Sequence, residues 1–286
     1  MIRFGVVGTG WRTKFFLRIA HARPDLFEVV GVVTRNIEQA TEWMQPYHVP
    51  LFDSLDQLLA QNPLYVITSL PRAVNPRIII ELVANNVPVL SETPPAGSIE
   101  EMEALYKLVQ NGAKIAVAEQ YHLQPHHEAR INFVNSGKMG NISQAQVSVA
   151  HGYHGISLIR RLLGIMYEDV TISARQFVSP VVHGLERYGL PDKEEMIDST
   201  QTIAQFDFGD KLGIFDFAGE QYRSYIRKQR MMVRGHRGEL IDERVIYLQD
   251  YRTPIQLDFE RRNAGERGNL EGYYFKGIQL GAEWVY

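Results

Sequence analysis

The sequence predicts an α/β fold followed by an α+β fold: a Rossmann-like, doubly wound parallel sheet, then a C-terminal domain with a large, mostly antiparallel sheet. Two observations support this. Strand-like and helix-like segments alternate up to about residue 120. After Tyr121 the pattern changes to alternating, strand-like segments with few helices between them. We therefore expect a dinucleotide-binding domain at 1–120 and an α+β substrate and oligomerisation domain at 121–286.

The first strand begins at Ile2 and runs into two glycines, Gly8 and Gly10, with a helical pattern from Arg12. At this spacing the first glycine permits a tight turn, and the second lets the backbone approach a pyrophosphate at the positive end of the helix. Thr13 stands where the G-x-G-x-x-G pattern has its third glycine, so a side chain must pack between helix and strand. Taken alone, the pattern fits a tight turn in any α/β protein equally well.

The rest of the first domain follows the same alternation. A short helix is expected after Asp53 or Ser54, either of which can cap it. The other expected strands cover 27–33, 64–68, 88–91 and 114–118, and the other helices cover 37–47, 75–85 and 99–111. In such a sheet, ligands bind at the carboxyl ends of the strands. Ligand groups are therefore expected in the loops 8–13, 34–35, 69–75, 92–95 and 119–121.

The second domain begins with an expected helix over 126–135, opened by His126 and His127, which we place at the surface. A hairpin is expected where the strands 202–208 and 212–217 meet at Gly209-Asp210. The other expected strands cover 143–149, 229–234, 244–249 and 253–259. So broad a sheet has too few helices to cover both faces, so we expect a homo-oligomer formed through the C-terminal sheet.

Composition excludes several classes of protein. The net charge is −3 and hydrophobic residues make up 45%, as in an ordinary globular protein. The one short basic stretch, 225–230, reads as a solvated strand face, so no nucleic-acid partner is expected. No apolar run approaches the ~20 residues that span a bilayer, and the first strand leaves no room for a signal peptide. Cysteine is absent, which fits a cytoplasmic location and excludes thiolate chemistry.

Six short motifs, in this order, resemble the glucose–fructose oxidoreductase and inositol dehydrogenase (Gfo/Idh/MocA) family over essentially the whole chain. They are the glycine turn, Arg35, Thr68-Ser69-Leu70-Pro71, Ser91-Glu92-Thr93-Pro94, Ser136-Gly137-Lys138-Met139-Gly140, and Gly152-Tyr153-His154 ahead of a helix ending Leu162-Leu163-Gly164. The resemblance implies a nicotinamide cofactor in the first domain. It also implies a small-molecule substrate, sugar-like or polyol-like, between the domains.

The chain departs from the family pattern at the residues that move protons. Thr93 replaces the lysine of the family's Glu-Lys-Pro motif, and Ala150 and Ser157 stand where acidic residues are frequent. A threonine hydroxyl is too weak an acid or base near neutrality to take over that work. His154 remains, and it and Tyr121 are the candidate catalytic residues. A capping or packing role for His154 is the competing interpretation.

Cofactor preference depends on the end of the second strand. An NAD-binding site usually has a carboxylate there for the ribose 2′-OH, whereas this chain has Thr34 followed by Arg35. We therefore expect NADP, with NAD as the alternative. Arg35 could also be a surface residue at the strand end, or lie over the adenine. The candidate cofactor-binding residues are Gly8, Thr9, Gly10, Trp11, Arg12, Thr34, Arg35, Ser69, Leu70, Pro71, Asn75, Glu92 and Thr93.

Two functional hypotheses follow. The first is an NAD(P)-dependent oxidoreductase acting on a sugar-like or cyclic polyol substrate. The second is a catalytically silent dinucleotide-binding protein, a sensor or partner subunit that kept the pocket and lost the lysine. His151 and His154 are spaced like a pair of metal ligands, but no third ligand accompanies them in the pattern, so no metal is expected.

Overall fold

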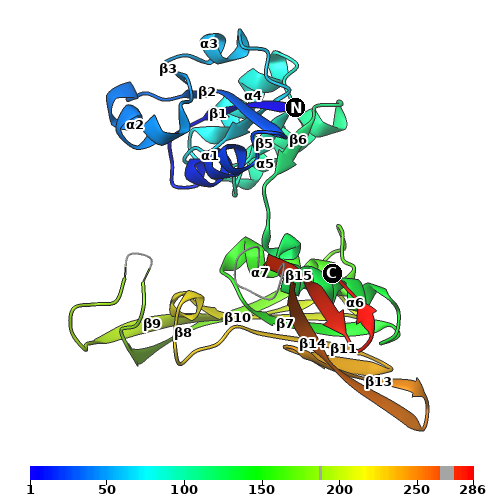
Figure 1. Cartoon of the computed structure of the whole chain (residues 1–286). Coiled ribbons are helices and arrows are strands. Elements are labelled where there is room, and N and C mark those ends of the chain that lie inside the picture. Colours follow the sequence, from blue (N-terminus) through cyan, green and yellow to red (C-terminus); the bar gives the residue numbers. More distant parts are fainter. Residues whose placement is uncertain (187–188, 265–273) are drawn as a thin grey trace. The chain divides into compact units, whose positions relative to one another are not determined.

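The structure is a computed structural model that describes residues 1–186, 189–264 and 274–286. It separates into two compact units, Met1–Glu119 and Gln120–Tyr286, which are described one at a time (Figure 1). The residues outside these ranges belong to the second unit and to none of the elements expected above.

The first unit is built on a six-stranded parallel sheet in the order β3-β2-β1-β4-β5-β6. Its strands are β1 (Ile2–Val7), β2 (Phe27–Val33), β3 (Leu51–Phe52), β4 (Tyr65–Thr68), β5 (Val89–Ser91) and β6 (Ile115–Val117). Its helices are α1 (Thr13–Ala22), α2 (Ile37–Met44) with the 3₁₀ turn Gln45–Tyr47, α3 (Leu55–Leu59), α4 (Asn75–Ala84) and α5 (Ile99–Gln110).

Each face of this sheet has its own buried core, as expected of parallel strands covered by helices on both sides. On one face Phe4 and Val6 of β1 join Leu17 of α1 and Met44 of α2. On the other face the strands pack against side chains of α3, α4 and α5, which are Leu58, Ile79, Leu82 and Leu105. The predicted doubly wound fold is thus confirmed, and Ser54, rather than Asp53, caps α3.

The second unit is built on a ten-stranded sheet in the order β16-β15-β14-β13-β12-β11-β7-β10-β9-β8. Its strands are β7 (Ile142–Ser148), β8 (Thr171–Val182), β9 (Met196–Asp207), β10 (Leu212–Ala218), β11 (Arg230–Gly235), β12 (Gly238–Ile241), β13 (Arg244–Asp250), β14 (Thr253–Ala264), β15 (Tyr274–Leu280) and β16 (Glu283–Trp284). The pairs are antiparallel except for β7 with β10. The expected large, mostly antiparallel sheet is present.

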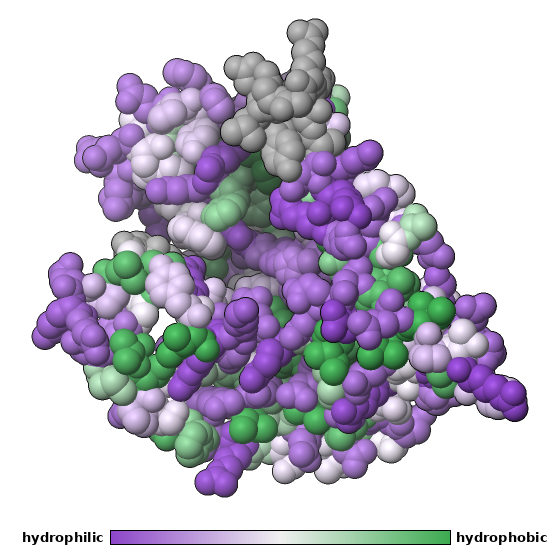
Figure 2. Space-filling model, turned by 60° about the horizontal axis from the view of Figure 1, so that its bottom comes forward, coloured by the Kyte–Doolittle hydropathy of each residue, from purple (hydrophilic) through white to green (hydrophobic). Residues whose placement is uncertain are grey.

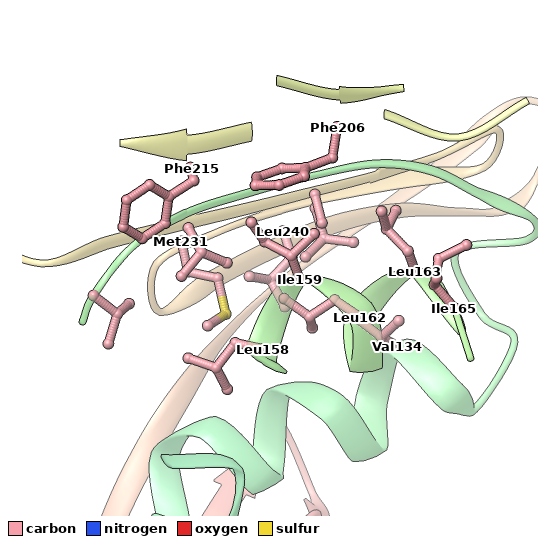
Figure 3. Close-up of a cluster of buried hydrophobic side chains, with 14 of the residues drawn as sticks. Val134, Leu158, Ile159, Leu162, Leu163, Ile165, Phe206, Phe215, Met231 and Leu240 are labelled. Carbon is pink, nitrogen blue, oxygen red and sulfur yellow. The ribbon is translucent and has the colours of Figure 1, made fainter. Parts of the chain in front are cut away.

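Two helices, α6 (Pro125–Asn135) and α7 (Gly152–Leu163), cover one face of this sheet. Figure 3 shows side chains of α7 pointing at side chains from the strands. The labelled members of this cluster are Val134, Leu158, Ile159, Leu162, Leu163, Ile165, Phe206, Phe215, Met231 and Leu240. Apolar burial on this scale makes the helix-covered face the core of the unit.

The opposite face of the sheet carries exposed apolar side chains among charged ones (Figure 2). Ile203, Ile241 and Ile246 are each between 40% and 49% exposed. On the same face, ion pairs join Arg244 to Asp258 on the neighbouring strands β13 and β14, and Arg230 of β11 to Asp216 of β10 across the intervening β7. No element of the described chain packs over these isoleucines.

Candidate functional site

The glycine turn of the first unit leaves no space for a side chain. Gly8 has φ +104°, and a Cβ there would lie 2.3 Å from the carbonyl oxygen of Ser69. The turn is held by backbone hydrogen bonds from Gly8 N–H to Val33 C=O (2.9 Å) and from Ser69 N–H to Val7 C=O (2.8 Å). The ends of β1, β2 and β4 are thereby drawn together, with Thr9 and Gly10 on the exposed rim.

Thr13, in the place of the third glycine, is completely buried. Its hydroxyl donates a hydrogen bond to the carbonyl oxygen of Gly8 (2.9 Å), so the extra side chain ties the helix to the turn. The start of α1 carries no side-chain cap and no acidic residue in its first turn. Such a helix end suits an anion, because its backbone N–H groups and dipole favour negative charge. These residues therefore fit a cofactor pyrophosphate.

Arg12 and Glu92, both predicted to bind the cofactor, form an ion pair with each other (Nε to Oε1, 3.0 Å). Their side chains are only 17% and 16% exposed, and the Arg12 guanidinium also lies over the rings of Trp11 and Phe15. The pair connects the start of α1 to the loop after β5. Thr93, which follows Glu92, is half-buried in that loop.

Asn75 is also a candidate cofactor contact, but its side chain is buried inside the first unit. Its Nδ2 donates to Ser91 Oγ (2.8 Å) and to the carbonyl oxygen of Pro95 (3.0 Å). Asn75 therefore fixes the loop after β5 against the start of α4. In the loop that leads to α4, Leu70 is half-buried and Pro71 is exposed.

At the end of β2 the buried Thr34 turns its hydroxyl toward its own chain. Its Oγ1 accepts a hydrogen bond from Asn36 N–H (3.2 Å), and Asn36 in turn caps α2 by accepting from Gln39 N–H (3.0 Å). Arg35 is exposed. Of the two residues at the end of β2, the one with an exposed side chain is therefore Arg35 and not Thr34.

The second unit brings the two catalytic candidates into contact. Tyr121 lies in the 3₁₀ turn Tyr121–Leu123, and its ring centroid is 4.6 Å from that of His154 in the first turn of α7. His154 is 7% exposed and also contacts the rings of Tyr153 and His151. A buried imidazole beside a phenol is an arrangement that can hold and pass a proton.

Tyr222 joins this cluster and was not among the sequence candidates. Its hydroxyl oxygen accepts a hydrogen bond from His151 N–H (2.9 Å) and contacts His151 Nδ1. β7 and β10 run parallel side by side, so the segments that follow them, with His151 and Tyr222, meet at the same end of the sheet. Nothing in the pattern of 14 tyrosines marks Tyr222; only the strand order does.

The prediction that His127 lies on the surface is wrong, although His126 is exposed as expected. His127 is 1% exposed because its face of α6 packs into the unit. Burial, with the neighbouring His126 and Arg130, strongly lowers the pKa of its imidazole. Arg130 can only donate, so the 3.4 Å contact from its Nη1 makes His127 Nδ1 the acceptor and places the proton on Nε2. Arg130 also reaches Glu243 (3.4 Å).

The comparisons with known proteins match the first unit to one protein family. The family described as "Oxidoreductase family, NAD-binding Rossmann fold" (GFO_IDH_MocA) matches residues 2–120. Through these residues the chain resembles the Gfo/Idh/MocA family. The expected resemblance is confirmed, and the matching family is one of oxidoreductases with an NAD-binding fold.

A curated relative matches part of the chain. "Uncharacterized oxidoreductase YgjR" from Escherichia coli is 28% identical over 106 residues, which are 36% of this chain and 32% of that protein. The match thus spans about a third of the curated relative.

Solved structures match over most of the length and show the fold. The WlbA dehydrogenase from Bordetella pertussis, in complex with NADH and UDP-GlcNAcA, has a TM-score of 0.64 at 19% identity, covering 84% of this chain and 78% of that one. Levoglucosan dehydrogenase in complex with NADH has a TM-score of 0.67 at 15% identity, covering 89% and 78%.

Two further kinds of feature are absent from the described residues. No helix among them is long and apolar enough to cross a membrane. Nor does any group of three or more His, Cys, Asp or Glu side chains within those ranges lie close enough together to hold a metal ion.

Proposed function

We propose that this protein is a nicotinamide-dependent oxidoreductase that oxidises a carbinol group of a sugar-like or cyclic polyol substrate, or reduces the matching carbonyl. The observation that carries the proposal is the contact between Tyr121 and His154 at the end of the second sheet. The cofactor-binding part of the proposal is supported by the family's NAD-binding fold and by the uncapped start of α1. Among structural neighbours, two are dehydrogenases solved with NADH, one of them together with a sugar nucleotide.

When bound, the nicotinamide accepts or supplies the hydride. The work left to this chain is to take the proton from the reacting hydroxyl, which typically contributes ~10²–10⁴-fold in rate, or roughly 3–5 kcal/mol of barrier. His154 is the side chain offered to accept this proton, and Tyr121, in contact with it, can pass the proton or orient the hydroxyl. Thr93 cannot do so, because its hydroxyl does not titrate near neutrality.

The competing proposal is a silent dinucleotide-binding protein that lost catalysis with the motif lysine. The decisive experiment incubates the full chain with NAD or NADP and a panel of sugars and cyclic polyols, and follows nicotinamide absorbance. We expect reduction of the cofactor with at least one substrate. Tight cofactor binding without turnover on any member of the panel would favour the silent protein.

We further propose that NADP(H) binds more tightly than NAD(H). No carboxylate at the end of β2 repels a 2′-phosphate, and the exposed Arg35 can pair with one. A charge-assisted contact contributes roughly 1.5–3 kcal/mol, or about 10- to 150-fold in affinity.

Titration calorimetry with both cofactors tests this preference. Arg35→Ala should remove most of the difference, whereas Arg18→Ala, also an exposed arginine of the first unit, should leave it intact. Equal affinities, or tighter NAD, would contradict the preference and leave the nucleotide-binding fold untouched.

We also propose that the protein forms a homo-oligomer through the open face of the second sheet. The support is the row of half-exposed isoleucines that no described element covers (Figure 2). Exposed apolar area on a sheet is commonly buried in subunit interfaces.

A further inference from the structure

A cavity of about 390 Å³ opens in the second unit where β8, β9 and the turn after β10 meet. This volume falls in the ~300–1,000 Å³ range of small-molecule sites. Val181 and Ile197, paired across β8 and β9, give it an apolar wall. Glu220, Tyr222 and Arg223, from the turn after β10, line it with polar groups.

Tyr222 connects this cavity to the catalytic candidates. It lines the cavity, and its hydroxyl contacts His151, whose ring centroid is 4.9 Å from that of His154. A molecule whose reacting carbon lies at His154 could therefore extend past Tyr222 into the cavity. The cavity is the natural place for the part of the substrate that does not react.

The polar lining suits hydroxyl groups. Glu220 accepts a hydrogen bond from Ser199 Oγ (2.7 Å), and a carboxylate can accept several more. Ser199 Oγ in turn accepts a hydrogen bond from Arg227 Nη1 (2.7 Å). These two hydrogen bonds hold the Glu220 side chain in place. A fixed carboxylate, an arginine and an aromatic ring beside aliphatic side chains match the alternating hydroxyls and C–H faces of a sugar ring.

The charges around the cavity do not suit a diphosphate. His183 lies between two carboxylates, Glu195 (2.9 Å) and Glu186 (2.8 Å), and these hydrogen bonds raise the pKa of its imidazole. When His183 is protonated, its charge is therefore matched by these two carboxylates. Glu220 offsets Arg223, so the lining offers no net positive charge to a doubly charged group, which proteins usually bind with clustered arginines or lysines.

We propose that this cavity, lined by Glu220, Tyr222, Arg223 and His183, is a subsite for a second, uncharged sugar ring, so that the substrate is a glycoside and not a nucleotide-linked sugar. The inference rests on the proposed function, since it deepens the same site. It assigns Glu220 a role in specificity and none in the chemistry.

The test measures binding to the full chain saturated with NADH, by calorimetry or ligand-observed NMR, and turnover separately. The probes are D-glucose, its disaccharides cellobiose and maltose, and UDP-glucose. We expect at least one disaccharide to bind roughly tenfold or more tightly than glucose and more tightly than UDP-glucose. Glu220→Gln keeps the acceptor for Ser199 and should remove most of the disaccharide's advantage, while Glu103→Gln, an exposed glutamate of α5, should not.

The outcomes separate this inference from the proposed function. UDP-glucose binding more tightly than both disaccharides, no preference for a disaccharide over glucose, or an unchanged preference in Glu220→Gln would overturn the subsite. Disaccharide binding that depends on Glu220 without any turnover would support the subsite and contradict the oxidoreductase.

Discussion

At the scale of single residues, the contact between His154 and Tyr121 makes a direct prediction. His154→Ala should lower turnover by about 10²–10⁴-fold, because the proton of the reacting hydroxyl loses its acceptor. The matched control is His48→Asn, an exposed histidine in the left-handed conformation that asparagine tolerates. Steady-state kinetics on both variants decide the role. Unchanged turnover in His154→Ala would leave the histidine a packing role only.

A second residue-scale prediction concerns the buried His127. Folding lowers its pKa from 6.5 to about 2, so the unfolded chain binds a proton that the folded chain refuses between these values. The free energy of unfolding should therefore fall as the pH drops below 6.5, by up to about 1.4 kcal/mol per pH unit from this group. Urea unfolding of His127→Phe across that range should show a shallower slope than the parent chain.

The control for this pH series is again His48→Asn, whose slope should match the parent. A slope in His127→Phe equal to the parent's would mean that His127 protonates inside the folded unit. Burial of the imidazole would then not prevent its protonation.

Some features of the site could be predicted from the sequence, and others could not. The turn at Gly8 and Gly10 could be predicted, because a positive φ and a close backbone contact favour glycine, and glycines are visible in the sequence. Tyr222 could not, because its role arises from strand order. The burial of His127 could not be predicted either. Two adjacent histidines at the start of a helix are typical of an exposed position, and only the packing of the helix shows that His127 is buried.

At the scale of elements, the packing of α7 on β10 makes a third prediction. A Cβ at Gly155 would lie 2.6 Å from the Phe215 ring and 2.8 Å from the carbonyl oxygen of Ala150. Gly155→Ala should destabilise the fold by about 1–3 kcal/mol through overpacking, although alanine is the better helix former by ~1 kcal/mol. Urea unfolding measures it, with Gly219→Ala as control because nothing lies within 4 Å of its Cβ position.

The sign of this change separates the two effects. Stabilisation by Gly155→Ala would mean that helix propensity prevails and that Phe215 has room to move.

Elements with a strong burial pattern were predicted best. The strand at 27–33 has the same bounds as β2, because its buried face gives it a continuous apolar run. β8 was missed, and β9 begins at Met196 instead of 202, because nearly all side chains of β8 are exposed and give no period. The short strands β3, β12 and β16 also went unpredicted, as did the longer β15.

At the scale of the whole molecule, the open sheet face predicts an assembly. Light scattering at micromolar concentration should give a mass that is a multiple of the 32.7 kDa chain. Ile246→Lys, on that face, should shift the protein toward the monomer by placing a charge in the interface. Ile80→Lys on α4 is the control, since Ile80 is equally exposed at 45% but lies in the first unit.

A monomer from the parent chain would contradict this assembly. So would an equal loss of mass in both variants, which would point to general destabilisation.

The parallel pairing of β7 with β10 has a consequence for synthesis on the ribosome. β7 emerges first among the strands of its sheet, yet its two partners, β10 and β11, begin only at Leu212 and Arg230. Until then both edges of β7 expose unpaired backbone groups, the kind of surface that other chains can join. The first unit, whose strands all lie within residues 2–117, can complete its sheet long before. The nascent chain therefore passes through a stage with one finished unit and one aggregation-prone strand, which is when a chaperone would be needed.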